Sequence, residues 1–204
     1  MSLALKTIIL LFICVNCFPQ TSQLSKYEKR WALWHPLAAM KVKKINKRAA
    51  VIYNQKDLLL LLDNYGSGGK LDAFRHAFFM AAFATQIKIK KLRKLGMAHE
   101  KGNYRQFLRS ATEEGEIPDS LASVMDLQNN ELGFVIGSAN KDSSLVSIKT
   151  LVLQDIIAGK ALIMKRNKRG EYLNCDNVPL KKTSLEKKWS LPKCLVASDY
   201  PYAD

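Results

Sequence analysis

The chain has 204 residues and a mass of 23.0 kDa, a size typical of one domain with an appendage. Hydrophobic residues make up 48% and charged residues 25%, a composition that excludes disordered, collagen-like and low-complexity proteins. The formal net charge of +14 predicts attraction to anionic surfaces without saying which surface.

The first 17 residues have the pattern of a signal peptide. A single charge at Lys6 precedes an apolar run over residues 7–15, which is shorter than the roughly 20 residues of a membrane-spanning helix. We therefore expect cleavage near residue 17 and a protein that is periplasmic or secreted. Two alternatives stay open: a lipid anchor at Cys17 or Cys14, and an uncleaved core helix.

Removal of the leader takes away Lys6 and no acid, so the mature chain keeps 31 basic against 18 acidic residues, or +13. It also takes away two of the four cysteines. Cys175 and Cys194 then remain in an oxidising compartment, where we expect a disulfide between them. Two free buried thiols are the alternative.

A helical domain is expected over residues 36–160, after a lead-in over 18–35. Following Pro36, apolar residues recur at spacings of three and four, the pattern of an amphipathic helix: Ala38, Val42, Ile45, Ala49 and Ile52. Its lysines are expected to form a solvated face. A second apolar helix over 57–65 should end at the glycine breaker 66–69, which lacks the preceding strand and the GK[ST] ending of a phosphate loop.

Segment 71–86 is apolar on nearly every side, which predicts a central buried helix. The basic segment 88–94 should contain a turn or a frayed join before helical spacing resumes. Two more helices are predicted over 120–137 and 145–159.

The basic C-terminal tail, residues 161–204, should begin with a short hairpin that turns at residues 167–170. The fold class expected from all these patterns is all-α. We predict a bundle of about five or six helices, followed by a short C-terminal hairpin or an irregular tail.

Three of the predicted core helices carry polar side chains among apolar ones. The first has Asp72, Arg75 and His76, the second His99 and Glu100, and the third Asp126, Asn129 and Asn130. Unpaired charges in an apolar core cost several kcal/mol, so these helices must supply partners to one another. We expect His76, His99, Glu100, Asp126 and Asn130 to converge in one pocket.

Three sequence blocks, DAFRHAFFMAAFA, LGMAHE and MDLQNNELGFVIG, resemble the signature of an uncharacterised bacterial helical domain family found in exported, wall-associated and toxin-like proteins. The resemblance extends over residues 36–137. It implies that the family motifs fall on Arg75, His76 and Ala77, on His99 and Glu100, and on Asp126, Leu127, Asn129, Asn130 and Gly133. The family has no established activity, so the resemblance locates a site without explaining it.

The first functional hypothesis is a hydrolase that acts on cell-envelope material. In its metal-dependent form, a divalent ion such as zinc is held by His76, His99 and Asp126. In its metal-free form, His76 or His99 is the general base, a carboxylate such as Glu100 orients it, and Arg75 stabilises an oxyanion. Asn129, Asn130 and Asp72 are the residues expected to bind substrate.

Two non-enzymatic hypotheses compete with the hydrolase. In one, the polar residues form a buried hydrogen-bond network that specifies how the helices dock. In the other, the basic helix and the lysine-rich tail bind an anionic cell-envelope polymer or a membrane surface. Export argues against nucleic acid as the partner, except for an exported nuclease toxin.

Overall fold

The computed structural model describes residues 24–55, 58, 61–110, 116–181 and 188–202. Within these ranges the chain forms six helices and one two-stranded sheet, which confirms the all-α class. In chain order they are α2 (Lys26–Trp34), α3 (Pro36–Tyr53), α5 (Lys70–Ala84), α6 (Ile89–Phe107), α7 (Ser120–Ala139), α8 (Leu145–Ile157), β1 (Leu162–Met164) and β2 (Leu195–Ala197).

The expected leader and the candidate lipid-anchor cysteines lie outside the described residues. Of the helices that the structure describes, none is both long enough and apolar enough to cross a membrane.

Helix α2 lies within the expected lead-in, where the sequence patterns predicted no helix. A capping box starts it: the Ser25 hydroxyl accepts the Glu28 backbone N–H, and the Glu28 carboxylate accepts the Ser25 backbone N–H. Trp31 anchors the helix, because its indole N–H donates to the Lys91 carbonyl in α6. The cap and one buried tryptophan thus suffice to define a nine-residue helix.

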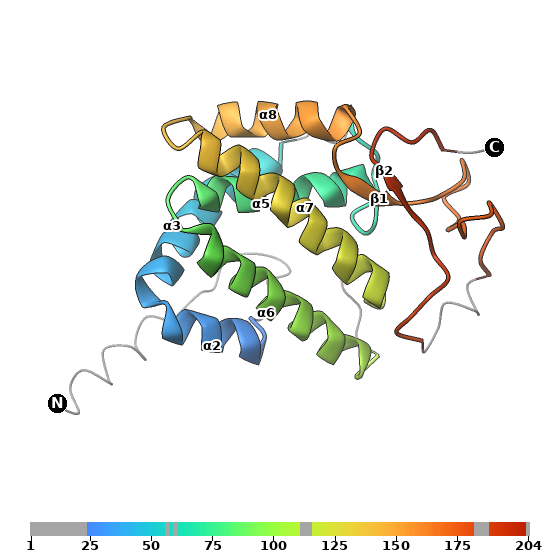
Figure 1. Cartoon of the computed structure of the whole chain (residues 1–204), viewed down its shortest axis with the longest axis horizontal. Coiled ribbons are helices and arrows are strands. Elements are labelled where there is room, and N and C mark those ends of the chain that lie inside the picture. The colour runs from blue at the N-terminus through green and yellow to red at the C-terminus, as the bar shows by residue number, and fades with distance from the viewer. Residues whose placement is uncertain (1–23, 56–57, 59–60, 111–115, 182–187, 203–204) are drawn as a thin grey trace.

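Helix α5 is central, as its sequence predicts (Figure 1). Phe74 and Phe78 are fully buried and their rings stack at 5.3 Å between centroids. The helix packs against α3, α6, α7 and α8. Contact with helices on several sides explains why most of its residues are apolar.

Helices α5 and α7 approach so closely that no side chain fits between them. A Cβ atom added to Gly133 would lie 2.2 Å from the carbonyl oxygen of Ala77, and one added to Gly137 would lie 2.1 Å from that of Ala81. The contacts advance by four residues on both helices, so the helices run in the same direction through the crossing. Figure 1 shows them crossing in the middle of the molecule.

The turn before α6 comes earlier than the sequence predicted. The chain turns over residues 85–88, and α6 begins at Ile89, so most of the basic segment 88–94 is helical. Leu92 of this segment is fully buried, and that contact holds the helix in place despite its lysines.

The predicted helix over 57–65 lies partly outside the described residues. Leu58 and Leu62 are buried, and the Leu62 backbone N–H donates to the Leu58 carbonyl. Residues 62–65 are not helical, so the predicted end was wrong. Asp63 explains the break, because its carboxylate accepts backbone N–H groups from Tyr65, Lys70 and Leu71 and so caps the start of α5.

The C-terminal tail is largely irregular and contains one pair of short strands and one disulfide. The chain reverses at residues 167–170 as predicted, with an isolated bridge between Arg166 and Tyr172. The partner of β1, however, is the distant β2, in antiparallel register with Ile163 opposite Val196. Cys175 and Cys194 form the expected disulfide, which joins the reversal to the strand that follows.

Replacing Gly133 by Ala should lower the free energy of unfolding by about 1–3 kcal/mol, because the added methyl group meets the backbone of α5. Chemical denaturation measures this change. Val135→Ala is the matched control: Val135 is exposed in the same helix, and its loss should change stability by less than about 0.5 kcal/mol. Equal stabilities of the two variants would contradict the close crossing.

Replacing both Cys175 and Cys194 by Ser should lower the free energy of unfolding by about 3 kcal/mol, because the bridge closes a loop of 19 residues. Under reducing conditions the wild-type protein should match the variant. A variant as stable as the oxidised wild type would show that the bridge does not constrain the tail.

Candidate functional site

Three acidic and basic side chains from α5 and α7 meet in the protein interior. The Nε2 atom of His76 lies 3.4 Å from the Oδ1 atom of Asp72, one turn earlier in α5. It lies the same 3.4 Å from the Oδ1 atom of Asp126 in α7. All three side chains are nearly buried, with exposures of 10% or less. The glycine crossing of the two helices makes this meeting possible.

Both oxygens of the Asp72 carboxylate accept hydrogen bonds. The Arg75 Nη2 atom donates to Oδ1 at 2.6 Å, and the backbone N–H of Gly68 donates to Oδ2 at 2.7 Å. The same Arg75 nitrogen lies 3.3 Å from His76 Nε2. The glycine loop 66–69 therefore supplies a hydrogen bond to the site, a role that its sequence did not reveal.

Burial and charge act in opposite directions on these groups. Burial opposes ionisation of Asp72, but Arg75 and His76 outweigh it and hold the pKa of Asp72 well below its usual value. Burial alone would lower the pKa of His76, yet Asp126 and Asp72 raise the pKa above 6.5. Burial raises the pKa of Asp126 to about 8, with further contributions from Asp72 and Glu100, although His76 opposes the shift. Burial of Asp126 is thus compensated less than that of Asp72, and its carboxyl group holds a proton to a higher pH than an ordinary aspartate does.

His99 lies beside this cluster but has a different partner. Its ring centroid is 6.2 Å from that of His76. Its Nδ1 atom lies 3.2 Å from the Glu28 carboxylate in α2. Burial opposes ionisation of Glu28, but His99 reverses the effect and lowers the pKa of Glu28. His99 therefore joins α6 to α2, and nothing in the sequence patterns indicated Glu28 as its partner.

Glu100 is buried one residue further along α6 and accepts a hydrogen bond from the Asn103 amide at 3.2 Å. Asn130 of α7 is buried against α6, where a Cβ atom at Gly96 would lie 3.0 Å from its Nδ2. Glu100 and Asn130 are therefore buried but do not belong to the cluster of Asp72, His76 and Asp126.

Asn129 points away from the cluster. Its amide group both donates to the Leu162 carbonyl and accepts the Leu162 backbone N–H, at 3.0 and 2.9 Å. These two bonds attach β1 to α7. The amide is thus engaged with backbone, which supports a structural role in place of the substrate contact expected from sequence.

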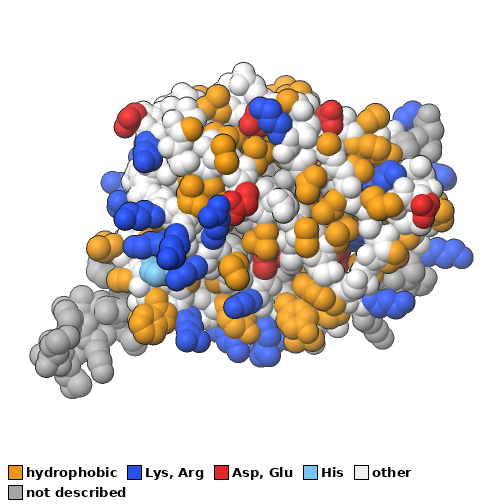
Figure 2. All heavy atoms as spheres, in the orientation of Figure 1, with side chains coloured by type: hydrophobic (Ala, Val, Ile, Leu, Met, Phe, Trp, Pro, Cys, Tyr) orange, Lys and Arg blue, Asp and Glu red, His pale blue; other side chains and the backbone are white. Residues whose placement is uncertain are grey.

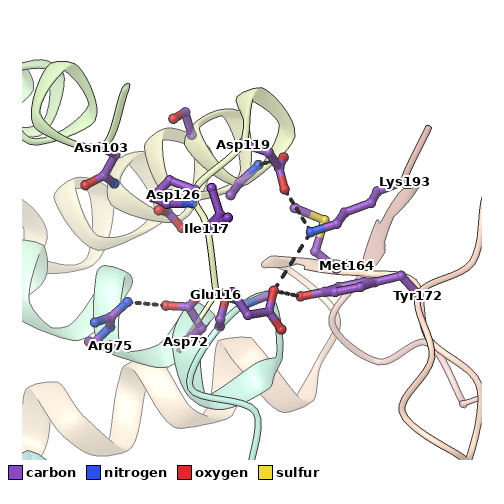
Figure 3. Close-up of a pocket in the computed structure, with 15 residues that line it drawn as sticks. Asp72, Arg75, Asn103, Glu116, Ile117, Asp119, Asp126, Met164, Tyr172 and Lys193 are labelled. Atoms are coloured by element: carbon purple, nitrogen blue, oxygen red, sulfur yellow. Dashed lines mark hydrogen bonds and ion pairs between the residues drawn. The ribbon is translucent and has the colours of Figure 1, made fainter. Parts of the chain in front are cut away.

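A small pocket opens onto the cluster (Figure 3). Its volume is about 30 Å³, enough for an ion, a water molecule or one small substrate group. Asp72, Arg75 and Asp126 form its inner wall, whereas His76, His99, Glu100 and Asn130 do not line it. Of the five residues expected to converge in one pocket, His76, His99, Glu100, Asp126 and Asn130, only Asp126 lines this pocket.

The opposite wall comes from the tail and from the segment before α7. Lys193 lies 2.8 Å from the Asp119 carboxylate and 3.9 Å from that of Glu116, and the Tyr172 hydroxyl donates to Glu116 (Figure 3). Asp119 is also the N-cap of α7. None of these residues was predicted from the sequence as part of the site. Only Asp119 had a sequence signal, because it stands directly before the predicted helix, where an aspartate often caps the first turn.

Arg166 fixes this wall to the glycine loop. Its guanidinium lies between the rings of Tyr65 and Tyr172, at 4.3 and 3.8 Å from their centroids, and donates to the Ser67 carbonyl. Arg166 and Lys193 are almost fully buried. Two basic side chains of the tail thus make their contacts inside the protein.

The residues best placed to hold a metal ion differ from the expected set by one member. Within the described part of the chain, ligand atoms of Asp72, His76 and Asp126 all lie within 4.8 Å of one another. Asp72 takes the place expected for His99, whose Nδ1 faces Glu28. The Oδ1 atom of Asp126 is buried and accepts no hydrogen bond. Such an atom costs free energy unless a cation or a proton satisfies it.

Replacing Asp126 by Asn should lower the pKa of His76, because a negative charge that raises this pKa against the effect of burial is lost. NMR titration in the presence of a chelator measures this pKa. A folded-state pKa raised above 6.5 stabilises the fold below that pH, and the contribution is lost as pH rises through the raised value. The variant should therefore lose part of this pH dependence. Asp142→Asn, an exposed change, should leave the His76 pKa unchanged, and equal titration curves would contradict the coupling.

Comparison with known proteins identifies a family for this chain but no activity. No curated protein and no solved structure matches the chain. A family model described as a domain of unknown function, DUF6973, matches residues 29–160. The match includes α5, α6 and α7 with all three cluster residues, whereas the tail that completes the pocket lies outside it. The chain belongs to the DUF6973 family of domains of unknown function.

Proposed function

We propose that this protein is an exported hydrolase of cell-envelope material, and that Asp72, His76 and Asp126 hold a divalent metal ion. The observation that carries the proposal is the buried Oδ1 atom of Asp126, which accepts no hydrogen bond and faces two further ligand atoms. Two buried carboxylates and one imidazole are a donor set suited to zinc.

The spacing of the donor atoms supports the metal. Two ligands bound at about 2.0–2.1 Å to a tetrahedral zinc ion lie about 3.3–3.4 Å apart. The two Nε2–Oδ1 distances at His76 are both 3.4 Å. The raised pKa of Asp126 also fits, because a bound cation would compensate the charge that burial disfavours.

The remaining residues suit hydrolysis of a small polar group. A bound zinc ion would supply an acidic water molecule near neutral pH. Arg75 lines the same pocket and presents a guanidinium that can neutralise negative charge developing on a substrate oxygen. A pocket of about 30 Å³ admits only the reacting group, so the rest of the substrate would lie outside it.

The cell envelope is the proposed setting because three features agree with export. They are the signal-peptide pattern of the first 17 residues, the disulfide between Cys175 and Cys194, and the net basic charge. Envelope polymers and phospholipid headgroups are the anionic material that such a protein would meet.

A second candidate function has its own supporting observation. Arg75 Nη2 lies within 3.3 Å of both Asp72 Oδ1 and His76 Nε2, so the guanidinium can serve as the cation of the cluster. The site would then be a buried network that docks α5 onto α7. The two candidates differ in what Arg75 does, because a network needs it and a metal site does not.

Zinc should stabilise the protein by about 2.7 kcal/mol at a free concentration one hundred times the dissociation constant. Calorimetric titration and thermal unfolding measure the effect, with metal content determined on protein purified without chelator. Asp126→Asn should abolish it, because the neutral amide replaces a negatively charged ligand of the proposed site. Asp142→Asn should bind zinc as the wild type does.

Arg75→Gln separates the two candidate functions. A metal site predicts that this variant still binds zinc, whereas a docking network predicts a less stable protein with no zinc response. Hydrolysis is followed on purified envelope fractions, peptidoglycan and phospholipid vesicles, with and without chelator. Zinc binding without any hydrolysis would leave a structural metal site and contradict the enzyme. A wild-type protein that does not respond to zinc would contradict the metal site and the metal-dependent enzyme and leave the docking network.

A further inference from the structure

The junction of α2 and α3 exposes large apolar side chains to solvent. Leu33, Trp34, Leu37 and Met40 are each between 68 and 75% exposed. They lie at the end of α2 and in the first turns of α3, on either side of the bend at His35 and Pro36. Single exposed apolar residues are ordinary in proteins. Four of them within eight residues of the sequence, including a tryptophan, indicate an interaction surface.

The outer face of α3 continues this surface. With 100° per residue, Leu37, Met40, Lys44, Arg48 and Val51 fall within about one third of the helix circumference. All five are exposed, whereas Ala38, Ile45 and Ala49 are buried on the opposite side. The solvated face expected from sequence therefore carries exposed apolar side chains as well as cationic ones.

The charge of the two helices has one sign. Residues 26–53 contain eight Lys or Arg and a single acid, Glu28. Glu28 is mostly buried and pairs with His99, so it does not reduce the positive potential of the outer face. Figure 2 shows blue and orange side chains gathered at the lower left of the molecule, where Figure 1 places α2 and α3.

A groove between α2 and α6 has the same chemistry. Its volume is about 310 Å³, with Tyr27, Trp31 and Met97 among its walls and Arg30, Lys94 and Lys101 at its edge. Arg30 lies one turn before Trp34 on α2, so the groove adjoins the exposed apolar group. An apolar floor with cations around it suits a lipid with an anionic headgroup.

We propose that the α2–α3 face, defined as Leu33, Trp34, Leu37, Met40, Lys44, Arg48 and Val51, docks this protein on anionic phospholipid membranes. Tryptophan and aliphatic side chains on a basic helical surface enter the headgroup region, where the cations meet anionic lipids. The absence of exposed acids within residues 26–53 favours an anionic bilayer over a protein surface of mixed charge. The inference does not depend on the metal site.

The test measures partition of the full chain into vesicles of phosphatidylcholine, with or without one third phosphatidylglycerol. Binding should require the anionic lipid and weaken with salt. Leu37→Ser with Met40→Ser should lower the partition coefficient about tenfold, through lost apolar burial. Lys44→Ala with Arg48→Ala should also lower it about tenfold, with a smaller salt dependence.

Matched controls remove equivalent exposed side chains elsewhere. Val135→Ser with Val146→Ser, on α7 and α8, and Lys141→Ala with Lys168→Ala should partition as the wild type does. The leader is the same in every variant, so any difference reports the α2–α3 face. Brominated lipid should quench a fraction of the tryptophan emission, and Trp34→Phe should remove that fraction.

Three results would overturn the proposal. One is equal binding to neutral and anionic vesicles, and another is equal partition of the α2–α3 variants and their controls. The third is a dimer in sedimentation that the Leu37→Ser and Met40→Ser changes dissociate, because that would make a second copy of the chain the occupant of this face.

Discussion

The contact on which the rest of the structure depends is the crossing of α5 and α7 at Ala77 and Ala81 against Gly133 and Gly137. Small residues at a spacing of four on both helices bring the two backbones together. Because the helices run in the same direction there, the turns preceding the crossing also meet. Asp126, two turns before Gly133, thereby reaches Asp72 and His76. A wider crossing would separate Asp126 from His76 and leave the Asp126 carboxylate buried without this partner, at a cost of several kcal/mol.

The C-terminal tail supplies part of the pocket wall that faces the cluster. Asp119 caps α7 and pairs with Lys193, the neighbour of the disulfide-bonded Cys194. Arg166 connects the tail to the glycine loop, whose Gly68 donates to Asp72. A continuous set of polar contacts therefore runs from the disulfide to the buried cluster. The family match includes the part of the pocket lining that precedes residue 160, whereas Met164, Tyr172 and Lys193 of the tail lie outside it.

Sequence patterns predicted the parts of the fold governed by local rules. The largely apolar α5, the first residues of α7 and α8 and the turn at residues 167–170 follow from periodicity, caps and glycines. The motif residues Asp72, His76 and Asp126 were identified for the same reason, as charges among apolar neighbours. Helix α2 was missed because its stability comes from a capping box and one tryptophan contact, with little periodicity. The pairing of β1 with β2, the His99–Glu28 contact and the Lys193 wall are distant in sequence, and no local pattern encodes them.

We propose that the carboxylates of Asp72 and Asp126 and the imidazole of His76 hold a metal ion. The most direct measurement of this is an anomalous difference map at the zinc absorption edge, from crystals of the protein grown with zinc. We expect one strong peak within bonding distance of Asp72, His76 and Asp126. A map with the Arg75 guanidinium between these atoms and no peak there would contradict it and leave the cluster as a helix-docking network.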